Sequence, residues 1–192
     1  LEELFGALRE RIDWSDVEEV TFECEPGTLS LPKLQTLRDL GVTRLSLGVE
    51  NFNPAILERN NRAHRAEEIV RTYGFAREVG FPQVNIDLIA GMVGETDDNW
   101  AHCIERTLEL GPDSVTIYQM EVPYNTTIYR RMKDDETEEA PVADWATKRR
   151  WVREAFAALG ESGFEQSSAY TAYRGGGTSF LYRDSLWRGA DM

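Results

Sequence analysis

The feature that most constrains the fold is the alternation of short β-rich segments with amphipathic helical segments. Residues 17–24, 43–49, 84–91 and 114–122 have the composition of strands, and residues 30–40, 65–79 and 96–110 between them have helical spacing of apolar side chains. Successive strand-helix units of this kind build a parallel sheet with helices on its outside. The sequence therefore predicts an α/β fold with parallel strands and outer helices.

Local signals place the remaining elements and several helix ends. Asn53-Pro54 is a typical start for a short helix that ends near Arg59, and Ser30 is a candidate N-cap. Gly41, Gly80 and Gly111 are placed to end helices. Further helices are expected at 2–11 and 143–160, a last strand at 164–169, and a solvated acidic excursion at 124–140. We find no internal repeat and no linker, so residues 1–192 are expected to form a single domain.

The charge balance excludes some classes of partner. Lys and Arg number 21 against 34 Asp and Glu, which gives a formal net charge of -13. This charge opposes binding to nucleic acid or to an anionic membrane surface. No apolar stretch reaches the roughly 20 residues that span a bilayer. The amino-terminal stretch is a charged amphipathic pattern and not a signal peptide, so a cytoplasmic location is expected.

Cysteine and histidine are too few for a typical metal or disulfide framework. Cys24 and Cys103 are expected to be buried thiols. His64 and His102 both lie in sequence that we interpret as helical, which disfavours a His-rich catalytic metal site. No metal ligand is assigned, although an all-oxygen magnesium site stays open.

Acidic residues stand at or near the ends of four consecutive predicted strands: Glu23 with Glu25, Glu50, Asp87 and Glu121. The carboxyl ends of parallel strands face one edge of the sheet, so these side chains are expected to converge on one mouth. Each of them alone has a simpler interpretation as a solvated strand end or a helix-capping carboxylate. Arg62 follows the Glu50 strand and could pair with a ligand carboxylate. A small molecule with ribose hydroxyls, a cationic group and a carboxylate would match both the strand-end carboxylates and Arg62.

Three blocks of the sequence carry a resemblance to a known family. They are FECEPGTL (22–29), GVTRLSLGVENFNPAILERNNRAHRAEE (41–68) and AREVGFPQVNIDLIAGMVGET (76–96). In order and spacing they resemble radical S-adenosylmethionine (SAM) enzymes of the oxygen-independent coproporphyrinogen III oxidase type, whose blocks read like E-V-D-P, R-L-S-x-G-V-Q-x-F and N-I-D-L-I-x-G-L-P. The resemblance implies a partial (β/α) barrel of the TIM type. Residues 1–192 would be a core fragment with the barrel strands after the second, ending before the C-terminal domain.

The resemblance also implies a cofactor site. Glu23, Arg62 and Asp87 match positions at which the family contacts S-adenosylmethionine, and Glu50 stands where the family usually has glutamine. An ionised glutamate only accepts hydrogen bonds, so Glu50 is expected to meet a donor such as Arg62. The strand-end pattern adds Glu121 to the expected cofactor-binding set. No catalytic residue is assigned.

The sequence departs from the family at the iron-sulfur motif. The CxxxCxxC motif, whose three thiolates hold a [4Fe-4S] cluster, is absent, and in relatives it precedes the stretch that matches Leu1. The sequence is therefore expected to be a fragment whose cluster ligands lie in a missing amino-terminal segment. The glycines of GGGT (175–178) are expected to form a flexible loop and not the family's glycine motif.

The activity implied by the resemblance is that of an oxidoreductase of porphyrin and heme biosynthesis. Such an enzyme decarboxylates propionates of coproporphyrinogen III to vinyl groups by way of a 5′-deoxyadenosyl radical, with an electron-donor protein as partner. Candidate partners of the propionates are Arg130, Arg131, Arg174 and Arg183, although ordinary surface arginines would look the same. Alternatives within the family are a heme chaperone or heme-binding protein and a radical SAM methyltransferase.

Overall fold

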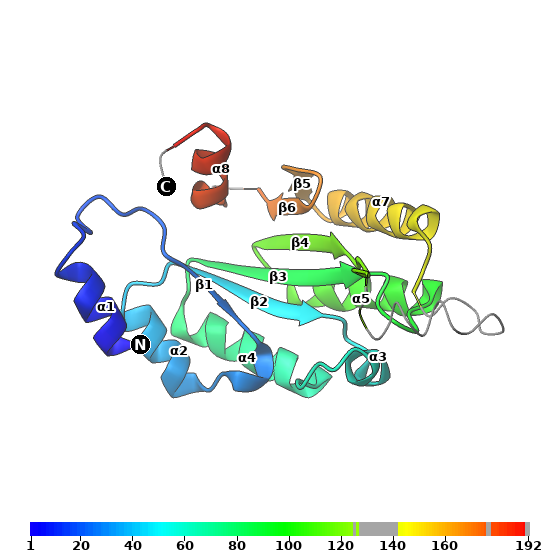
Figure 1. Cartoon of the computed structure of the whole chain (residues 1–192), viewed down its shortest axis with the longest axis horizontal. Helices are drawn as coiled ribbons and strands as arrows, with labels where there is room; N and C mark the ends of the chain where they lie inside the picture. Colours follow the sequence, from blue (N-terminus) through cyan, green and yellow to red (C-terminus); the bar gives the residue numbers. More distant parts are fainter. Residues whose placement is uncertain (125, 127–141, 176–177, 191–192) are drawn as a thin grey trace.

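The computed structural model describes residues 1–124, 126, 142–175 and 178–190. At its centre, the described part of the chain forms a six-stranded sheet of order β1-β2-β3-β4-β6-β5 (Figure 1). The strands are β1 (Thr21–Cys24), β2 (Arg44–Glu50), β3 (Gln83–Ala90), β4 (Ser114–Gln119), β5 (Phe164–Gln166) and β6 (Thr171–Arg174). The helices are α1 (Glu2–Arg9), α2 (Leu31–Asp39), α3 (Pro54–Arg59), α4 (Ala66–Val79), α5 (Asp97–Leu110), α7 (Trp145–Glu161) and α8 (Leu181–Trp187), with a 3-10 turn, η1 (Pro26–Thr28).

The first four strands are parallel, which confirms the predicted α/β fold with outer helices. Their register aligns Glu23 with Ser46, Ser46 with Asn85, and Asp87 with Thr116. Polar residues of neighbouring strands therefore lie side by side on one face of the sheet.

The carboxy-terminal part of the sheet differs from the prediction of one last strand at 164–169. The chain reverses after β5, and β6 lies antiparallel between β4 and β5. The hydroxyl of Ser168 accepts hydrogen bonds from the backbone N–H groups of Tyr170 (3.1 Å) and Thr171 (3.0 Å). This local turn, typical of serine, ends the strand early and directs the chain back along the sheet.

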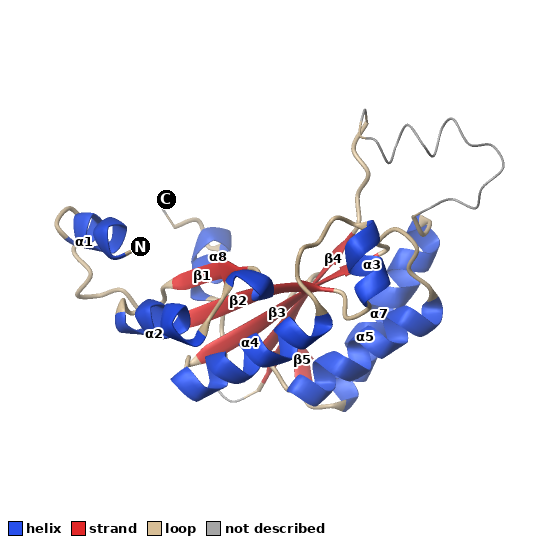
Figure 2. Ribbon diagram, turned by 90° about the horizontal axis from the view of Figure 1, so that it is seen from below, coloured by secondary structure: helices blue, strands red, loops and turns tan. Residues whose placement is uncertain are grey.

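Helices α2, α4 and α5 cover one face of the sheet (Figures 1 and 2). Beneath them lie the alternate, fully buried apolar side chains of β2, β3 and β4: Leu45, Leu47, Val49, Val84, Ile86, Leu88, Val115 and Ile117. Helix α7 packs against α5 and β5. The core thus lies between the sheet and these helices, on one side of the sheet only.

Most of the predicted helix ends are confirmed. The side chains of Asn53 and Thr96 cap α3 and α5 by accepting backbone N–H groups. Gly80 and Gly111 end α4 and α5 with φ angles of 79° and 66°, in the left-handed region that favours glycine. Ser30 does occupy the N-cap position of α2, but its side chain makes no capping hydrogen bond.

Three features near the two ends of the chain differ from the expectation. The strand predicted at 17–24 begins only at Thr21, because its partner β2 begins opposite that residue, at Arg44. In α1 only Phe5 is buried, whereas Leu4 is 57% exposed. Helix α8 was not predicted, and Glu19 accepts a hydrogen bond from its first backbone N–H, at Leu181 (2.9 Å).

Some expectations lie outside the described residues. They concern most of the acidic excursion at 124–140, including Arg130 and Arg131, and two glycines of the 175–178 segment. None of the helices that the structure describes is both long enough and apolar enough to cross a bilayer.

Candidate functional site

The face of the sheet opposite α2, α4 and α5 is polar. Alternate side chains of a strand point to opposite faces, and those facing away from the helices include Glu23, Arg44, Ser46, Asn85, Asp87, Thr116 and Tyr118. Parallel sheets are ordinarily apolar on both faces. The polar face opposite the helices is therefore suited to binding a ligand and not to packing a second hydrophobic core.

A cavity of about 480 Å³ lies on this face at the carboxyl ends of β1, β2 and β3. We call it the acidic cavity, and it is lined by Glu23, Cys24, Glu25, Ser46, Gly48, Glu50, Arg62, Asp87, Ile89 and Tyr118. Four of the five residues predicted for a cofactor site thus come together as expected. The fifth, Glu121, does not belong to this lining within the described part of the chain.

Glu50 lines the acidic cavity from the last position of β2, where the strand is irregular. Gly48 pairs with Asp87 and Glu50 with Leu88, so Val49 is an extra residue in β2. Glu50 also has a φ angle of 64°, in the left-handed region that a glutamate seldom adopts. Backbone strain of this kind costs about 1 to 3 kcal/mol and gathers at functional sites. Glu50 follows the same alternation as Arg44, Ser46 and Gly48, which directs its carboxylate toward the cavity face.

Arg62 meets Glu50 as the residue types suggested. Its Nε atom forms an ion pair with Oε2 of Glu50, and the side chains of Arg62 and Glu50 are 40% and 13% exposed. Among the described residues, that oxygen has no hydrogen-bond partner besides this contact. Arg62 is therefore held at the rim and keeps donors for a further partner.

Asp87 is held by a buried polar network. Ser46 Oγ donates to Asp87 Oδ2 (2.8 Å), and Asn85 Nδ2 donates to Asp87 Oδ1 (2.8 Å) and to Ser46 Oγ (2.9 Å). Asn85 Oδ1 in turn accepts from Ser114 (2.7 Å) and Thr116 (3.2 Å). These contacts fix the orientation of the Asp87 carboxylate toward the cavity.

Burial and like charges make the cavity unfavourable for negative charge in the absence of a ligand. Burial raises the pKa of Asp87, against the lowering effect of hydrogen bonds from Ser46 and Asn85. Burial also raises the pKa of Glu50, although Arg62 and His64 oppose the shift. A cationic ligand group would stabilise both ionised carboxylates.

His64 does not lie in a helix, in contrast to the prediction. It lies in the loop before α4 and is buried, with Nδ1 3.1 Å from Glu25 Oε1 and Nε2 3.0 Å from the backbone oxygen of Val49. These two contacts place the imidazole between Glu25, which follows β1, and Val49, near the end of β2. His64 therefore positions the segment that carries Arg62. His102 lies in α5, as predicted.

Glu121 lies beyond the end of β4 and is exposed. Its charge acts on Lys148, the buried lysine of α7, whose Nζ donates to the backbone oxygen of Met120 (2.6 Å). The prediction for Glu121 depended on a strand reaching 122, whereas β4 ends at Gln119.

A second cavity of about 190 Å³ adjoins the first and was missed in the sequence. We call it the arginine cavity, and it shares Glu23, Ser46, Asp87 and Tyr118 with the acidic cavity. Its other lining residues are Arg44, Thr116, Ser168, Tyr170, Thr171, Phe180, Arg183 and Trp187. The alternation of Arg44, Ser46 and Gly48 in β2 is the signal that could have revealed it.

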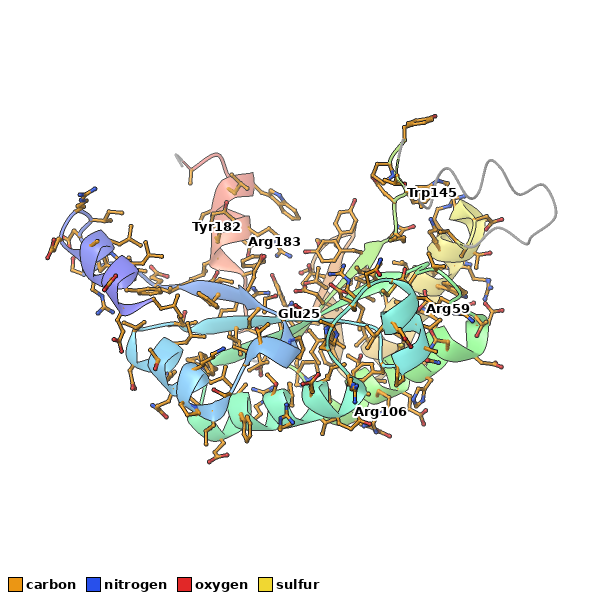
Figure 3. All side chains as sticks on the ribbon, turned by 60° about the horizontal axis from the view of Figure 1, so that its bottom comes forward. Glu25, Arg59, Arg106, Trp145, Tyr182 and Arg183 are labelled. Atoms are coloured by element: carbon orange, nitrogen blue, oxygen red, sulfur yellow. The ribbon has the colours of Figure 1, made fainter. Side chains whose placement is uncertain are left out.

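Of the arginines proposed as propionate partners, only Arg183 lines this cavity among the described residues. Arg183 lies on α8, on the side of the sheet opposite Arg106 of α5 (Figure 3). It pairs with Asp184 (2.6 Å). Arg174 is exposed, and its guanidinium lies over the ring of Phe164.

The two cysteines do not form a cluster site. Cys103 is buried and Cys24 half-buried, and burial raises the pKa of both thiols to about 12. Among the residues that the structure describes, no group of three or more His, Cys, Asp or Glu side chains could hold a metal ion. Two thiols also fall short of the three thiolates that this kind of [4Fe-4S] ligation needs.

Comparison with known proteins defines the class. The sequence model of the Radical SAM superfamily matches residues 2–107, more than half of the chain. The chain is 34% identical to the heme chaperone HemW of Bacillus subtilis over 62% of its own length and 31% of that protein. It is 32% identical to the oxygen-independent coproporphyrinogen III oxidase of Escherichia coli over 84% of its own length and 35% of that protein.

The fold agrees with this comparison. The solved coproporphyrinogen III oxidase of Escherichia coli, described as a radical SAM enzyme, superimposes with a TM-score of 0.78 at 30% identity, covering 90% of this chain and 39% of that one. The chain belongs to the radical SAM superfamily and, within it, to the oxygen-independent coproporphyrinogen III oxidase-like family, which includes the heme chaperones. It spans about a third of the length of these two relatives (31% and 35%).

Proposed function

We propose that the acidic cavity binds S-adenosylmethionine. The observation that carries this proposal is the convergence of Glu23, Glu50, Asp87 and Arg62 on one cavity of about 480 Å³ at the carboxyl ends of parallel strands. This volume lies within the range of about 300 to 1,000 Å³ typical of small-molecule sites. Membership of the radical SAM superfamily supports the same ligand.

The donors and acceptors of the cavity suit the chemistry of this ligand. Carboxylates accept hydrogen bonds from ribose hydroxyls and attract the positive sulfonium and amino groups. Arg62 stands at the rim, where it would bind the ligand carboxylate in competition with Glu50. When bound, S-adenosylmethionine supplies the hydrogen-abstracting chemistry of the superfamily. The residues of this chain bind it, orient it and keep water away. Glu121 is not part of this proposal.

The [4Fe-4S] cluster that the superfamily implies does not fit the residues present. The sequence contains two cysteines, and both thiols have a strongly raised pKa, so neither is prepared to act as a thiolate ligand. No step of the proposal therefore depends on a cluster bound by this chain.

For the complete protein we propose the oxidative decarboxylation of a propionate-bearing tetrapyrrole, as in an oxygen-independent coproporphyrinogen III oxidase. The alignment to such an oxidase over 84% of this chain supports the proposal. An electron-donor protein would then be a required partner. The 34% identity to a heme chaperone favours a second candidate, a heme-binding role.

Calorimetric titration of the complete protein with S-adenosylmethionine tests the cavity. Asp87→Ala should weaken binding by about 1 to 3 kcal/mol, because it leaves the donors of Ser46 and Asn85 and the ligand's own groups without an acceptor. Asp39→Ala, on the exposed side of α2, is the control and should bind as the wild type does. Equal affinities for the Asp87 variant and the control would show that the acidic cavity is not the binding site of S-adenosylmethionine.

The two candidate functions separate in an anaerobic assay of the complete protein with coproporphyrinogen III, S-adenosylmethionine and a reductant. Formation of vinyl groups supports the oxidase. Tight heme binding without turnover supports the chaperone.

A further inference from the structure

Arg44 is a buried cation that the proposed cofactor site does not use. It begins β2, is 2% exposed, and projects into the arginine cavity. Its Nε atom is buried without a hydrogen-bond partner in the described part of the chain. A buried guanidinium with an unused donor is costly, because the charge loses its water without gaining a full set of acceptors.

Among the described residues, no acidic group forms an ion pair with Arg44, although the charges of two of them reach it. The charges of Glu19 and Asp87 act on the guanidinium through space, and burial nevertheless lowers its pKa. The carboxylate of Glu19 accepts hydrogen bonds from Thr21 Oγ1 (3.0 Å) and from the backbone N–H of Leu181 (2.9 Å). Asp87 is held by its two neighbours in the polar network. If Arg44 served only to balance the charge of these carboxylates, its guanidinium would be expected to pair directly with one of them.

The guanidinium is also held in place before any ligand arrives. The Phe180 ring, just before α8, packs against it, with 4.0 Å between Arg44 Cζ and the ring centroid. Stacking of this kind leaves the edge of the guanidinium, where its N–H groups lie, available for a planar acceptor. The fork of an arginine matches the two oxygens of a carboxylate.

The cavity favours a single negative charge. Two carboxylates, Glu23 and Asp87, line it together with Arg44 and Arg183, and Arg183 already pairs with Asp184. A dianionic phosphate would therefore meet two negative groups beside the one guanidinium, that of Arg44, that forms no ion pair among the described residues, whereas a carboxylate carries half that charge. The hydroxyl-bearing residues Ser168, Tyr170 and Thr171 lie in the same lining. A volume of about 190 Å³ is several times the roughly 30 Å³ that one water occupies, which is enough for a short carboxylate arm.

We propose that Arg44 anchors a carboxylate group of the substrate in the arginine cavity, while the substrate's reacting part lies toward the adjoining acidic cavity. The shared lining residues Glu23, Ser46, Asp87 and Tyr118 connect the two cavities. The inference rests on the proposed function, since it takes this carboxylate to be a propionate of a tetrapyrrole. Arg44 then sets specificity for an acidic substrate and fixes its orientation.

A fluorescence titration of the complete protein with coproporphyrin III and with its uncharged tetramethyl ester tests the anchor. Arg44→Gln should weaken binding of the acid about tenfold or more and change binding of the ester little. Arg44→Lys keeps the charge and should recover part of the loss. Arg71→Gln is the control, because Arg71 is 52% exposed on α4 and pairs with Glu68. Equal binding of the acid by the wild type and Arg44→Gln overturns the anchor.

A second measurement uses the wild-type protein and needs no knowledge of the substrate. The ¹⁵N signal of Arg44 Nε, identified by its absence in Arg44→Lys, should shift on titration with sodium propionate. A signal that stays in place overturns the anchor. If propionate shifts the signal and coproporphyrin does not bind, the carboxylate anchor stands and the tetrapyrrole substrate fails.

Discussion

The guanidinium of Arg62 contacts the carboxylate of Glu50 at the rim of the acidic cavity. Arg62 lowers the pKa of Glu50, whereas burial raises it. We therefore expect Arg62→Gln to raise the pKa of Glu50 further, with less than about 1 kcal/mol change in stability, since the arginine is 40% exposed. Titration of the Glu50 carboxyl carbon by ¹³C NMR measures this. Arg153→Gln, on the exposed side of α7, should leave it unchanged.

Removal of Asn85 should be costly. Its side chain is fully buried and joins Ser46, Asp87, Ser114 and Thr116. Asn85→Ala leaves these groups partly unsatisfied, and we expect a loss of about 2 to 4 kcal/mol in the free energy of unfolding. Thr116→Val removes one bond of the network and should cost less. Guanidinium denaturation followed by tryptophan fluorescence compares the two, and equal losses would contradict the role of Asn85 as the hub.

The thiol of Cys24 should be unreactive in the native protein. Burial raises its pKa from 9.0 to about 12, with further increases from Asp87 and Glu23. Because the thiolate is the reactive form, alkylation by iodoacetamide at pH 8 should be slower by roughly a thousandfold than for an ordinary thiol. Asp87→Asn removes one of the raising charges and should speed the reaction. Mass spectrometry after a short pulse, with the denatured protein as the reference, gives the rates.

Glu95 should make stability depend on pH. Burial raises the pKa of Glu95 from 4.5 to about 7, although Gly91 N–H (2.5 Å), Met92 N–H (3.2 Å) and Asn51 Nδ2 (2.7 Å) donate to its carboxylate. The folded protein therefore binds this proton more tightly than the unfolded chain. The resulting stability is fully present below about pH 4.5 and is lost as the pH rises to about 7.

The comparison of Glu95→Gln with the wild type measures this contribution. The difference between their free energies of unfolding should change by about 3 kcal/mol across that pH window, because the amide does not titrate. Glu105→Gln, whose parent side chain is 69% exposed on α5, should run parallel to the wild type. A constant difference for Glu95→Gln would show that its carboxyl does not titrate in this window.

The order of elements and most of the site followed from the sequence because their signals are local. Asn53 and Thr96 cap the helices that their positions indicated, and Glu23, Glu50 and Asp87 stand at or toward the carboxyl ends of strands that could be recognised. The contact between Arg62 and Glu50 was expected because an ionised glutamate can only accept hydrogen bonds and so needs a donor.

What could not be predicted depends on contacts between distant segments. Arg44 is a charged residue near the start of a predicted strand, and Phe180, far along the chain, packs against its buried guanidinium. The reversal into β6 depends on one serine turn in a segment with no glycine or proline. His64 is buried by contacts with Glu25 and Val49 that helical spacing does not reveal.

The two chemically distinct faces of the sheet separate folding from recognition. In β2, Leu45 and Leu47 pack under the helices, and Arg44 and Ser46, alternating with them, face the cavities. A shift of this strand by one residue would place a guanidinium in the core, so correct folding and a correctly formed site are a single requirement. Substitutions on the cavity face do not change the apolar side chains beneath the helices, although those that break the polar network around Asn85 cost stability. Relatives can therefore acquire new ligands by exchanging side chains on one side of the sheet while the architecture beneath them is preserved.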